Sequence, residues 1–267
     1  IDMGKIEICK KIKETIRHLV LVSDNQIKSV GTGIVIKDTG ILLTANHVIK
    51  DYFVLSNPKI IASSLSDIPQ AEYKPIFYNF SVDIDMPGFF VKPLEIDLAI
   101  LQPLQKTKGI SFMELDDDIA PEGTDVIMAG FPDEIKPPLH FDETLDFNNP
   151  ELAEKRLAIE NFFDYLMRLI MMKSGMIGST QRVNINTNFD MARFRKVISI
   201  NGAVYWVDNS STYGASGGPV INSAGKLIGI ICEKGMTQQK PDLEVPSGST
   251  MALSHKFITW YLDTIKP

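Results

Sequence analysis

Apolar residues at the start of the chain follow the spacing of an amphipathic helix. Between Lys5 and Arg17 they are separated by three or four positions, which places them on one helical face. These residues are Ile6, Cys9, Ile12 and Ile16. We expect a short helix here that packs against the rest of the protein as a lid or arm.

The period changes to that of β-strands from His18 onward. Short apolar runs separated by turn-forming residues predict a β-meander at 18–23, 27–37 and 41–45. Residues 50–93 are irregular and contain five prolines, so we expect surface loops there with one or two edge strands. Next comes an apolar strand.

This strand, at 95–101, is interrupted by Asp97. A carboxylate in such a strand is destabilising unless it is paired or hydrogen-bonded, and an imidazole is its natural partner. A candidate linker at 103–109 and an acidic loop at 115–122 then separate two β units.

Further apolar runs predict strands in the second unit, at 125–131, 175–184, 196–200, 203–207, 220–222 and 226–232. The pair Asn201-Gly202 is typical of a tight hairpin turn between two of these strands. Residues 254–265 predict a terminal helix.

A long helix is expected at about 149–173, where Asn149 can cap it and Pro150 occupies the first position. The segment contains too many Leu, Ile, Phe and Met residues for one narrow stripe. Such a helix is either largely covered by the core or exposes a docking surface.

The composition is that of a globular protein: 267 residues, 44% hydrophobic and 22% charged. The net charge of -6 and the scattered basic residues argue against a nucleic-acid partner. No apolar stretch reaches the roughly twenty residues that span a bilayer, and the N-terminus lacks a signal-peptide pattern. The chain begins at Ile1, so it can be a piece of something larger.

Two cysteines, Cys9 and Cys232, lie far apart in the sequence. Secreted proteins of this size usually carry several disulfides, so a reducing compartment is favoured, cytoplasmic first and periplasmic second. Histidines and cysteines are isolated, with no spacing typical of metal ligands, so we predict no metal and no cofactor.

Ser216 lies in the most informative stretch, YGASGGP at 213–219. The surrounding glycines let a backbone aim its amides at one point and admit a substrate closely. The stretch therefore predicts a nucleophilic serine or, alternatively, a structural turn.

His47 ends the third strand beside small residues, where its ring can face a cleft or be satisfied in the core. Nucleophilic catalysis by serine requires a base, an acid that orients the base, and amides for the oxyanion. His47, Asp97 and Ser216 can fill these roles in chain order.

Four segments together resemble the chymotrypsin-fold serine peptidases, most of all the bacterial trypsin-like and HtrA (Deg) branch. They are GTGIVI at 31–36, LTANHV at 43–48, DLAIL at 97–101 and GASGGP at 214–219. They follow the family's order between about 30 and 231. Four coincident segments are far more specific than any one.

The resemblance implies an all-β fold of two six-stranded antiparallel β-barrels, to which the residue pattern adds an N-terminal helix, a helical insertion in the second barrel and a C-terminal helix. Residues 1–108 would hold the first barrel with His47 and Asp97. Residues 109–267 would hold the second barrel with Ser216, and the insertion would lie at about 137–174. In the family this insertion point neighbours the cleft, so we expect it to gate access or receive an activating partner.

The resemblance also assigns roles. Ser216 would attack the scissile carbonyl, His47 would act as base and then acid, and Asp97 would fix the imidazole. The amides of Gly214 and Ser216 would form the oxyanion hole.

The other histidines and the rival acids are poorer candidates, which supports His47 as the base and Asp97 as the acid. His18 precedes the barrel, His140 lies in a proline-rich loop and His255 opens the terminal helix. The rival acids, Asp83 and Asp85, lack an apolar strand behind them.

The pocket for the residue before the scissile bond would have Ser210 at its floor, where a Lys/Arg preference would need Asp. Its wall would be made of Ile230, Ile231 and Cys232, which favours small or medium apolar side chains. Asp208 or Glu233 could supply a charge by another route. Cys232 is expected to be a small core residue and not a second nucleophile.

Two departures from the family concern regulation. Ala215 stands where activation by N-terminal ion pairing needs an Asp, so that mechanism is not expected. The residues after Ser254 are too few for a PDZ domain.

The sequence thus predicts a serine endopeptidase acting on polypeptides, a regulated intracellular protease domain. One alternative is a catalytically silent or latent module that grips peptides by strand addition. Another is a protease effector domain of a larger sensor or defence protein.

Overall fold

The computed structural model describes residues 3–24, 26–65, 70–82, 93–133, 149, 152, 155, 169–191, 194–240 and 243–265. For the side chains of 186–198 and 237–244 it gives no description. Within the described residues, no helix combines the length and apolar character that crossing a bilayer requires.

The first half of the chain forms a closed barrel with the strand order β1-β2-β3-β8-β5-β4. Its strands are β1 (Ile16–Ser23), β2 (Gln26–Val35), β3 (Leu42–Thr44), β4 (Lys59–Ser63), β5 (Ala71–Phe77) and β8 (Ala99–Pro103). All pairs are antiparallel, and β1 closes the barrel by pairing with both β2 and β4. Alternate residues of β1 are fully buried, as expected for a strand with one face in a core.

The second half forms a closed barrel with the order β10-β11-β14-β13-β12-β9. Its strands are β9 (Asp125–Gly130), β10 (Met171–Met191), β11 (Phe194–Val207), β12 (Pro219–Asn222), β13 (Leu227–Lys240) and β14 (Leu243–Ser254). The prediction of an all-β fold with two six-stranded antiparallel barrels is confirmed.

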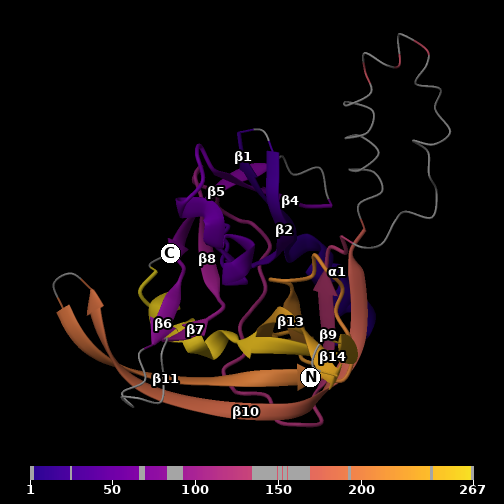
Figure 1. Ribbon diagram of the computed structural model, residues 1–267, viewed down its shortest axis with the longest axis vertical. Coiled ribbons are helices and arrows are strands. Elements are labelled where there is room, and N and C mark those ends of the chain that lie inside the picture. Colours follow the sequence, from indigo (N-terminus) through magenta and orange to yellow (C-terminus); the bar gives the residue numbers. More distant parts are fainter. Residues whose placement is uncertain are drawn as a thin grey trace.

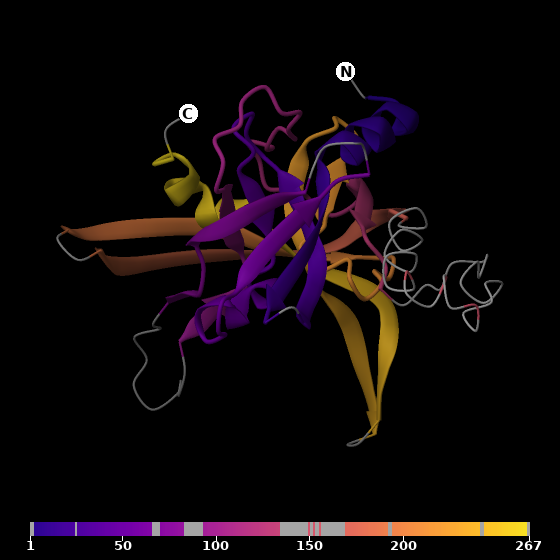
Figure 2. The same cartoon turned by 90° about the horizontal axis from the view of Figure 1, so that it is seen from above.

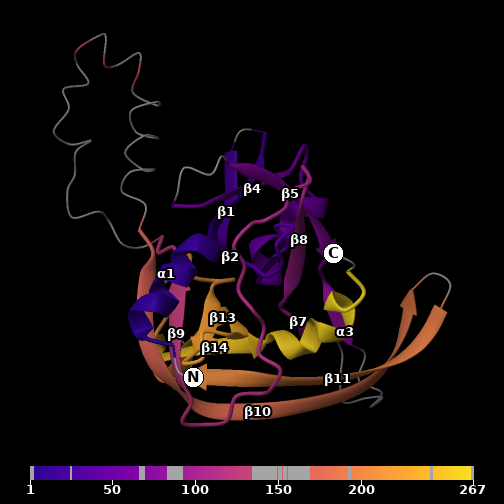
Figure 3. The same cartoon turned by 180° about the vertical axis from the view of Figure 1, so that it is seen from behind.

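One buried apolar cluster spans both barrels, and a second cluster lies within the second barrel. Ile34 and Leu43 of the first barrel belong to the same buried cluster as Ile127 and Ile221 of the second. Figures 1 and 3 show the first barrel standing on the second, with α1 beside β9 and β13. The predicted boundary at 108/109 lies between β8 and β9.

Helix α1 (Lys5–Thr15) confirms the predicted N-terminal helix, but its buried face differs from the prediction. Ile8 and Ile12 are buried, whereas Ile6 is 74% exposed. The amide of Met3 donates to the carbonyl of Ser223 at 2.9 Å, while the other end of the helix continues directly into β1. The helix therefore connects the two barrels.

The predicted hairpin turn at Asn201-Gly202 is wrong. A single strand, β11, runs through both residues, with Asn201 opposite Asn184 and Gly202 opposite Val183 on β10. A Cβ at Gly202 would lie 2.5 Å from the ring of Phe257. Glycine is there because another element packs against the strand, and not because the chain turns.

Other boundaries also differ from the predictions. The strand expected at 95–101 is two strands, β7 (Leu94–Ile96) and β8, with Asp97 between them. Two barrel strands, β4 and β5, lie in the region expected to be mostly loop, and the register shift at Pro75 shows how β5 accommodates a proline. β7 also pairs with β6 (Phe80–Val82) in a small separate sheet.

The two helices predicted in the second half do not match the structure over their full length. The terminal helix is shorter, made of η4 (His255–Ile258) and α3 (Thr259–Leu262), because 243–254 form β14. Most of the helix predicted at 149–173 lies outside the described residues. Its expected end at 171–173 is wrong, since these residues begin β10.

Long hairpins extend the second barrel. Pairing of β10 with β11 continues to Met191 and Phe194, and β13 pairs with β14 as far as Lys240 and Leu243. Figure 2 shows the two hairpins projecting from the body of the molecule in different directions.

Candidate active site

His47 is positioned by the abrupt end of β3. The chain stays extended at Ala45 and then forms one turn of 3-10 helix, η1 (Asn46–Val48). The Asn46 side chain donates to the Asn79 side chain at 2.9 Å and accepts from the Asn79 amide at 2.8 Å. This reciprocal pair fixes the turn that carries His47.

Asp97 holds His47 at two points. Its Oδ2 lies 2.7 Å from His47 Nδ1, and its Oδ1 accepts from the His47 backbone amide at 2.8 Å. The two side chains are 41% and 29% exposed, so the pair is accessible from solvent. When Nδ1 carries the proton and donates to Asp97, Nε2 is left as the basic nitrogen of the ring.

The turn at Asp97 is supported from behind by Cys232. The amide of Leu98 donates to the Ile96 carbonyl at 2.7 Å, which turns the chain tightly at Asp97. The Cys232 thiol donates to the Asp97 carbonyl at 3.5 Å. Burial, followed by the charge of Asp97, raises the pKa of Cys232 well above its usual value. A neutral buried thiol is a poor nucleophile, in line with the predicted core role.

Ser216 sits in a loop folded around two glycines with positive φ, Gly214 at 83° and Gly217 at 84°. The loop closes on itself, because the Gly218 amide donates to the Ala215 carbonyl at 2.8 Å. It also joins β13 through the Gly217 amide and the Ile231 carbonyl at 2.8 Å. Ser216 itself is only partly buried.

The same loop contacts the element that carries His47. A Cβ at Gly31 would lie 2.6 Å from Val48 Cγ1 and 3.2 Å from the Ser216 carbonyl oxygen. A Cβ at Gly217 would lie 3.1 Å from the Ala45 amide. The Ser216 loop and the turn that carries His47 therefore pack closely, at positions where a side chain larger than that of glycine would clash.

No direct hydrogen bond links Ser216 Oγ to His47 Nε2 among the residues that the structure describes. Contacts of this kind are often long in free enzymes and shorten when substrate binds.

Thr32 fixes the backbone of the Ser216 loop. Its hydroxyl donates to the Gly214 carbonyl at 2.8 Å and accepts from the Phe131 amide at 3.1 Å. Its amide donates to the Ser216 carbonyl at 2.8 Å. The Thr44 hydroxyl in turn donates to the Thr32 carbonyl at 2.6 Å. The sequence analysis included Thr32 only in a motif and gave it no role.

The amides of Gly214 and Ser216 are available for the predicted oxyanion hole. In the described part of the chain, neither donates to a backbone carbonyl. The contacts of Thr32 to the carbonyls of both residues fix the peptide units that follow these two amides.

A narrow recess lies beside the Ser216 loop. It is lined by Met128, Ala129, Gly130, Met171, Lys173, Ser211, Thr212, Ala215 and Ile231. Of the four predicted pocket residues, Ile231 lines it directly. The carbonyl of Ser210 accepts a hydrogen bond from the Lys173 ammonium at 2.5 Å.

Ile230 and Cys232 are not among the residues that line this recess. Successive residues of a strand face opposite sides, and these two point into the core shared with the first barrel. Of the charges proposed for the pocket, Asp208 instead accepts from the Met176 amide at 2.7 Å. The sequence analysis missed Lys173, because the segment 171–173 was expected to be helical.

The two competing histidines that the structure describes form no second candidate pair with an acid among the described residues. His18 packs its ring against Phe131, and His255 is buried between the carbonyls of Ile228 and Asp116. His140, Asp83 and Asp85 lie outside the described residues. Across the described ranges, no group of three His, Cys, Asp or Glu residues is arranged to hold a metal ion.

The family model for the trypsin-like peptidase domain matches residues 31–230. The chain belongs to this family. It is a serine peptidase, and its four motifs all lie within or next to the matched range. No curated protein sequence matches the chain.

Solved structures similar to this trypsin-like peptidase include HtrA-type proteases. The active form of the Rv3671c protease from M. tuberculosis has a TM-score of 0.58 at 15% identity, covering 97% of this chain and 83% of that chain. The serine endoprotease from Yersinia pestis has a TM-score of 0.58 at 16% identity, and the match covers 99% of this chain and 67% of that chain. The HtrA-type protease AlgW with tripeptide has a TM-score of 0.57 at 16% identity, and the match covers 98% of this chain and 64% of that chain. These likenesses show the shared fold.

Proposed function

We propose that this protein is a serine endopeptidase that hydrolyses peptide bonds through His47, Asp97 and Ser216. The observation that carries the proposal is the contact of 2.7 Å between His47 Nδ1 and Asp97, beside the loop of Ser216. This is an imidazole with an oriented basic nitrogen next to a serine in a glycine-rich turn.

In the proposed reaction, Ser216 Oγ attacks the scissile carbonyl while His47 Nε2 takes its proton. Asp97 accepts from the opposite ring nitrogen and stabilises the imidazolium that forms. His47 then donates the proton to the leaving amine, which leaves an acyl group on Ser216. Water activated by the same imidazole hydrolyses the ester and restores the enzyme.

The oxyanion of each tetrahedral intermediate would be held by the amides of Gly214 and Ser216. Preorganised donors of this kind contribute because they need no rearrangement as charge develops. Thr32 provides the preorganisation, since it bonds to the carbonyls of both residues.

Substrate backbone can bind along β13. This strand pairs with β12 only as far as Ile230, whereas its pairing with β14 continues to Lys240. Among the described strands, the other edge of β13 beyond Ile231 has no partner, so an extended peptide can add there. A catalytically silent peptide-binding module would use the same edge, and only activity distinguishes the two functions.

Peptide hydrolysis by the purified protein and its variants tests the proposal. Ser216→Ala should abolish turnover, and Asp97→Asn should lower kcat by about 10,000-fold, because the imidazole loses its correct tautomer. Retained hydrolysis in Ser216→Ala would refute the assignment of the nucleophile. Peptide binding without hydrolysis in the wild type would favour the binding module.

Regulation inside a cell is part of the proposal. Cys9 and Cys232 are free thiols, which suits a reducing compartment. The structures of the similar Rv3671c protease include an active form and an inactive form. The insertion at about 137–174, most of which lies outside the described residues, is proposed to gate the cleft or bind an activator, as an effector domain of a larger protein would require. Unchanged peptidase kinetics after deletion of 137–168 would rule this out.

A further inference from the structure

Lys173 places a positive charge in the recess next to Ser216. The recess is formed by the loop that ends in Ala215, by Ile231 of β13 and by the start of β10, which contributes Met171 and Lys173. A side chain entering beside the scissile bond would meet this recess first, because Ala215 directly precedes the nucleophile.

The ammonium of Lys173 is held weakly. Its hydrogen bond goes to a neutral backbone carbonyl, that of Ser210, at 2.5 Å. Among the described residues no carboxylate pairs with it. A half-buried cation with a single neutral acceptor gains free energy when a carboxylate replaces that acceptor.

We propose that Lys173 selects substrates with Asp or Glu immediately before the scissile bond, which rests on the proposed peptidase function. The recess leaves only about 10 Å³ free, so the flexible lysine has to move from the Ser210 carbonyl to the entering carboxylate. Met171 and Ile231 provide apolar walls for the methylene part of the substrate side chain.

The test compares tetrapeptide p-nitroanilides that differ only in the last residue: Glu, Asp, Gln, Ala or Leu. The wild type should hydrolyse the Glu peptide about 10- to 100-fold faster in kcat/KM than the Gln peptide, the usual range for one charge-assisted hydrogen bond. Lys173→Met should remove this ratio and Lys173→Glu should reverse it. Lys28→Met, on an exposed lysine bonded to Gln26, is the matched control and should leave the ratio unchanged.

A wild type that prefers Gln, Ala or Leu, or a Glu preference that survives in Lys173→Met, would overturn the inference. Labelling of Ser216 by a fluorophosphonate keeps the two claims separate. If Ser216 is labelled but no acidic preference exists, only the role of Lys173 is wrong. If Ser216 is not labelled in the folded protein, the proposed function itself is contradicted.

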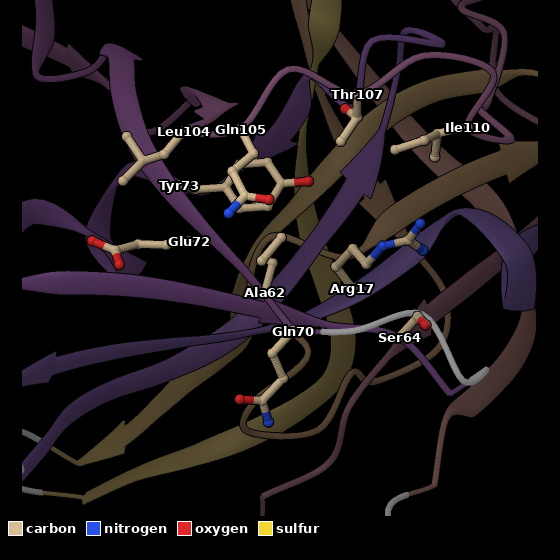
Figure 4. Close-up of a pocket in the computed structure, with 11 residues that line it drawn as sticks. Arg17, Ala62, Ser64, Gln70, Glu72, Tyr73, Leu104, Gln105, Thr107 and Ile110 are labelled. Atoms are coloured by element: carbon tan, nitrogen blue, oxygen red, sulfur yellow. The ribbon is translucent and has the colours of Figure 1, made fainter.

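A second, independent observation is a cavity of about 400 Å³ in the first barrel, between β1, β4, β5 and the chain after β8. Figure 4 shows Arg17 on one side of it and Glu72 on the opposite side. Arg17 is 5% exposed and Tyr73 is 4% exposed, so two nearly buried polar side chains line one cavity.

The guanidinium of Arg17 is only partly satisfied. Its Nη1 donates to the carbonyls of Glu14 and Ile16, both at 2.8 Å, at the end of α1. Its Nε and Nη2 have no acceptor, and no carboxylate pairs with it, among the described residues. Burial lowers the pKa of Arg17 and raises that of Tyr73. A buried cation that is not paired with a carboxylate destabilises the protein unless another group compensates its charge.

We infer that this cavity binds a small organic carboxylate. Nε and Nη2 form the fork that binds carboxylate oxygens in pairs, and the Tyr73 hydroxyl points to the same side of the cavity (Figure 4). One guanidinium balances one carboxylate, whereas a phosphate dianion would leave excess charge. Leu104 and Ile110 would contact the apolar part of the ligand.

Benzoate and its neutral isostere benzamide are suitable probes, with backbone NMR shifts of β4 and β5 as the readout. Benzoate should shift these amides and benzamide should not. Arg17→Met should weaken benzoate binding at least about tenfold, and Tyr73→Phe by a smaller factor, as expected for a charged and a neutral hydrogen bond. Lys74→Met, on an exposed residue of the same strand, should bind as the wild type does.

Equal binding of benzoate and benzamide, or binding of neither, would overturn this inference, as would unchanged benzoate binding in a folded Arg17→Met. Should Arg17→Met not fold, the comparison of the two probes and the Tyr73→Phe variant still decide the question.

Discussion

At the scale of single residues, the site depends on side chains that connect parts of the chain far apart in sequence. Thr32 belongs to β2, yet its hydroxyl bonds to Gly214 and to Phe131. His47, Asp97 and Ser216 were predicted from the sequence as the candidate triad because each lies in a local motif. Thr32 also lies in a motif, but the motif does not indicate its contacts, and Lys173 lies in none; both roles come from contacts between segments far apart in the chain.

Thr32→Val tests the support of the oxyanion loop. The substitution keeps the shape but leaves the Phe131 amide and the Gly214 carbonyl without their partner, which should destabilise the protein by about 1–3 kcal/mol. We expect kcat to fall by about 10- to 100-fold with a smaller change in KM, because the catalytic geometry loosens. Thr124→Val, which removes a surface hydroxyl bonded to Pro121, is the control. Equal kcat in both variants would contradict the role of Thr32.

At the scale of elements, packing between segments overrides local turn signals. The pair Asn201-Gly202 has the sequence of a hairpin turn, but both residues pair with β10 within β11, and the missing side chain of Gly202 leaves room for the Phe257 ring of η4. Similarly, Pro75 suggested a loop and lies in a barrel strand with a register shift. The apolar periods predicted the presence of α1, β1 and β2, although α1 buries Ile8 and leaves Ile6 exposed.

Gly202→Ala tests this explanation. The new Cβ would lie 2.5 Å from the Phe257 ring, so η4 must shift, and we expect a loss of about 1–3 kcal/mol in the free energy of unfolding. Gly178→Ala on β10 is the matched control, because its Cβ would have its nearest neighbour at 3.5 Å. Equal stability of the two variants by chemical denaturation would show that the packing explanation is wrong.

His255 makes the stability of η4 dependent on pH. Burial, and then the charge of Lys256, lowers the pKa of His255 from 6.5 to about 4, although its two carbonyl neighbours favour the proton. The unfolded chain therefore binds this proton more tightly. The stabilisation that comes from burying His255 in its neutral form is therefore complete above pH 6.5. As the pH falls to about 4, the free energy of unfolding decreases by about 3 kcal/mol.

The prediction is that His255→Gln loses less stability than the wild type between pH 6.5 and 4. Denaturant midpoints of both proteins over this range measure the difference, and groups that titrate in both proteins cancel. Parallel curves would show that His255 does not titrate with a lowered pKa.

At the scale of the whole molecule, the two barrels bring His47 and Asp97 from one half of the chain to Ser216 from the other. The sequence predicted this architecture through four short motifs in a recognisable order, and the fold confirms it. The long hairpins β10–β11 and β13–β14 could not be predicted in full, because the strand pairs at their outer ends, up to 191/194 and 240/243, lie beyond the pairing that closes the barrel.

The central claim is that His47, Asp97 and Ser216 act together as one catalytic unit. Labelling with a fluorophosphonate probe tests it most directly, in the wild type and in Ser216→Ala and His47→Ala. We expect the wild type to be labelled, Ser216→Ala not to be labelled, and His47→Ala to react far more slowly, because the serine needs its base. A folded wild type that is not labelled, or labelling that persists without Ser216, would contradict the account.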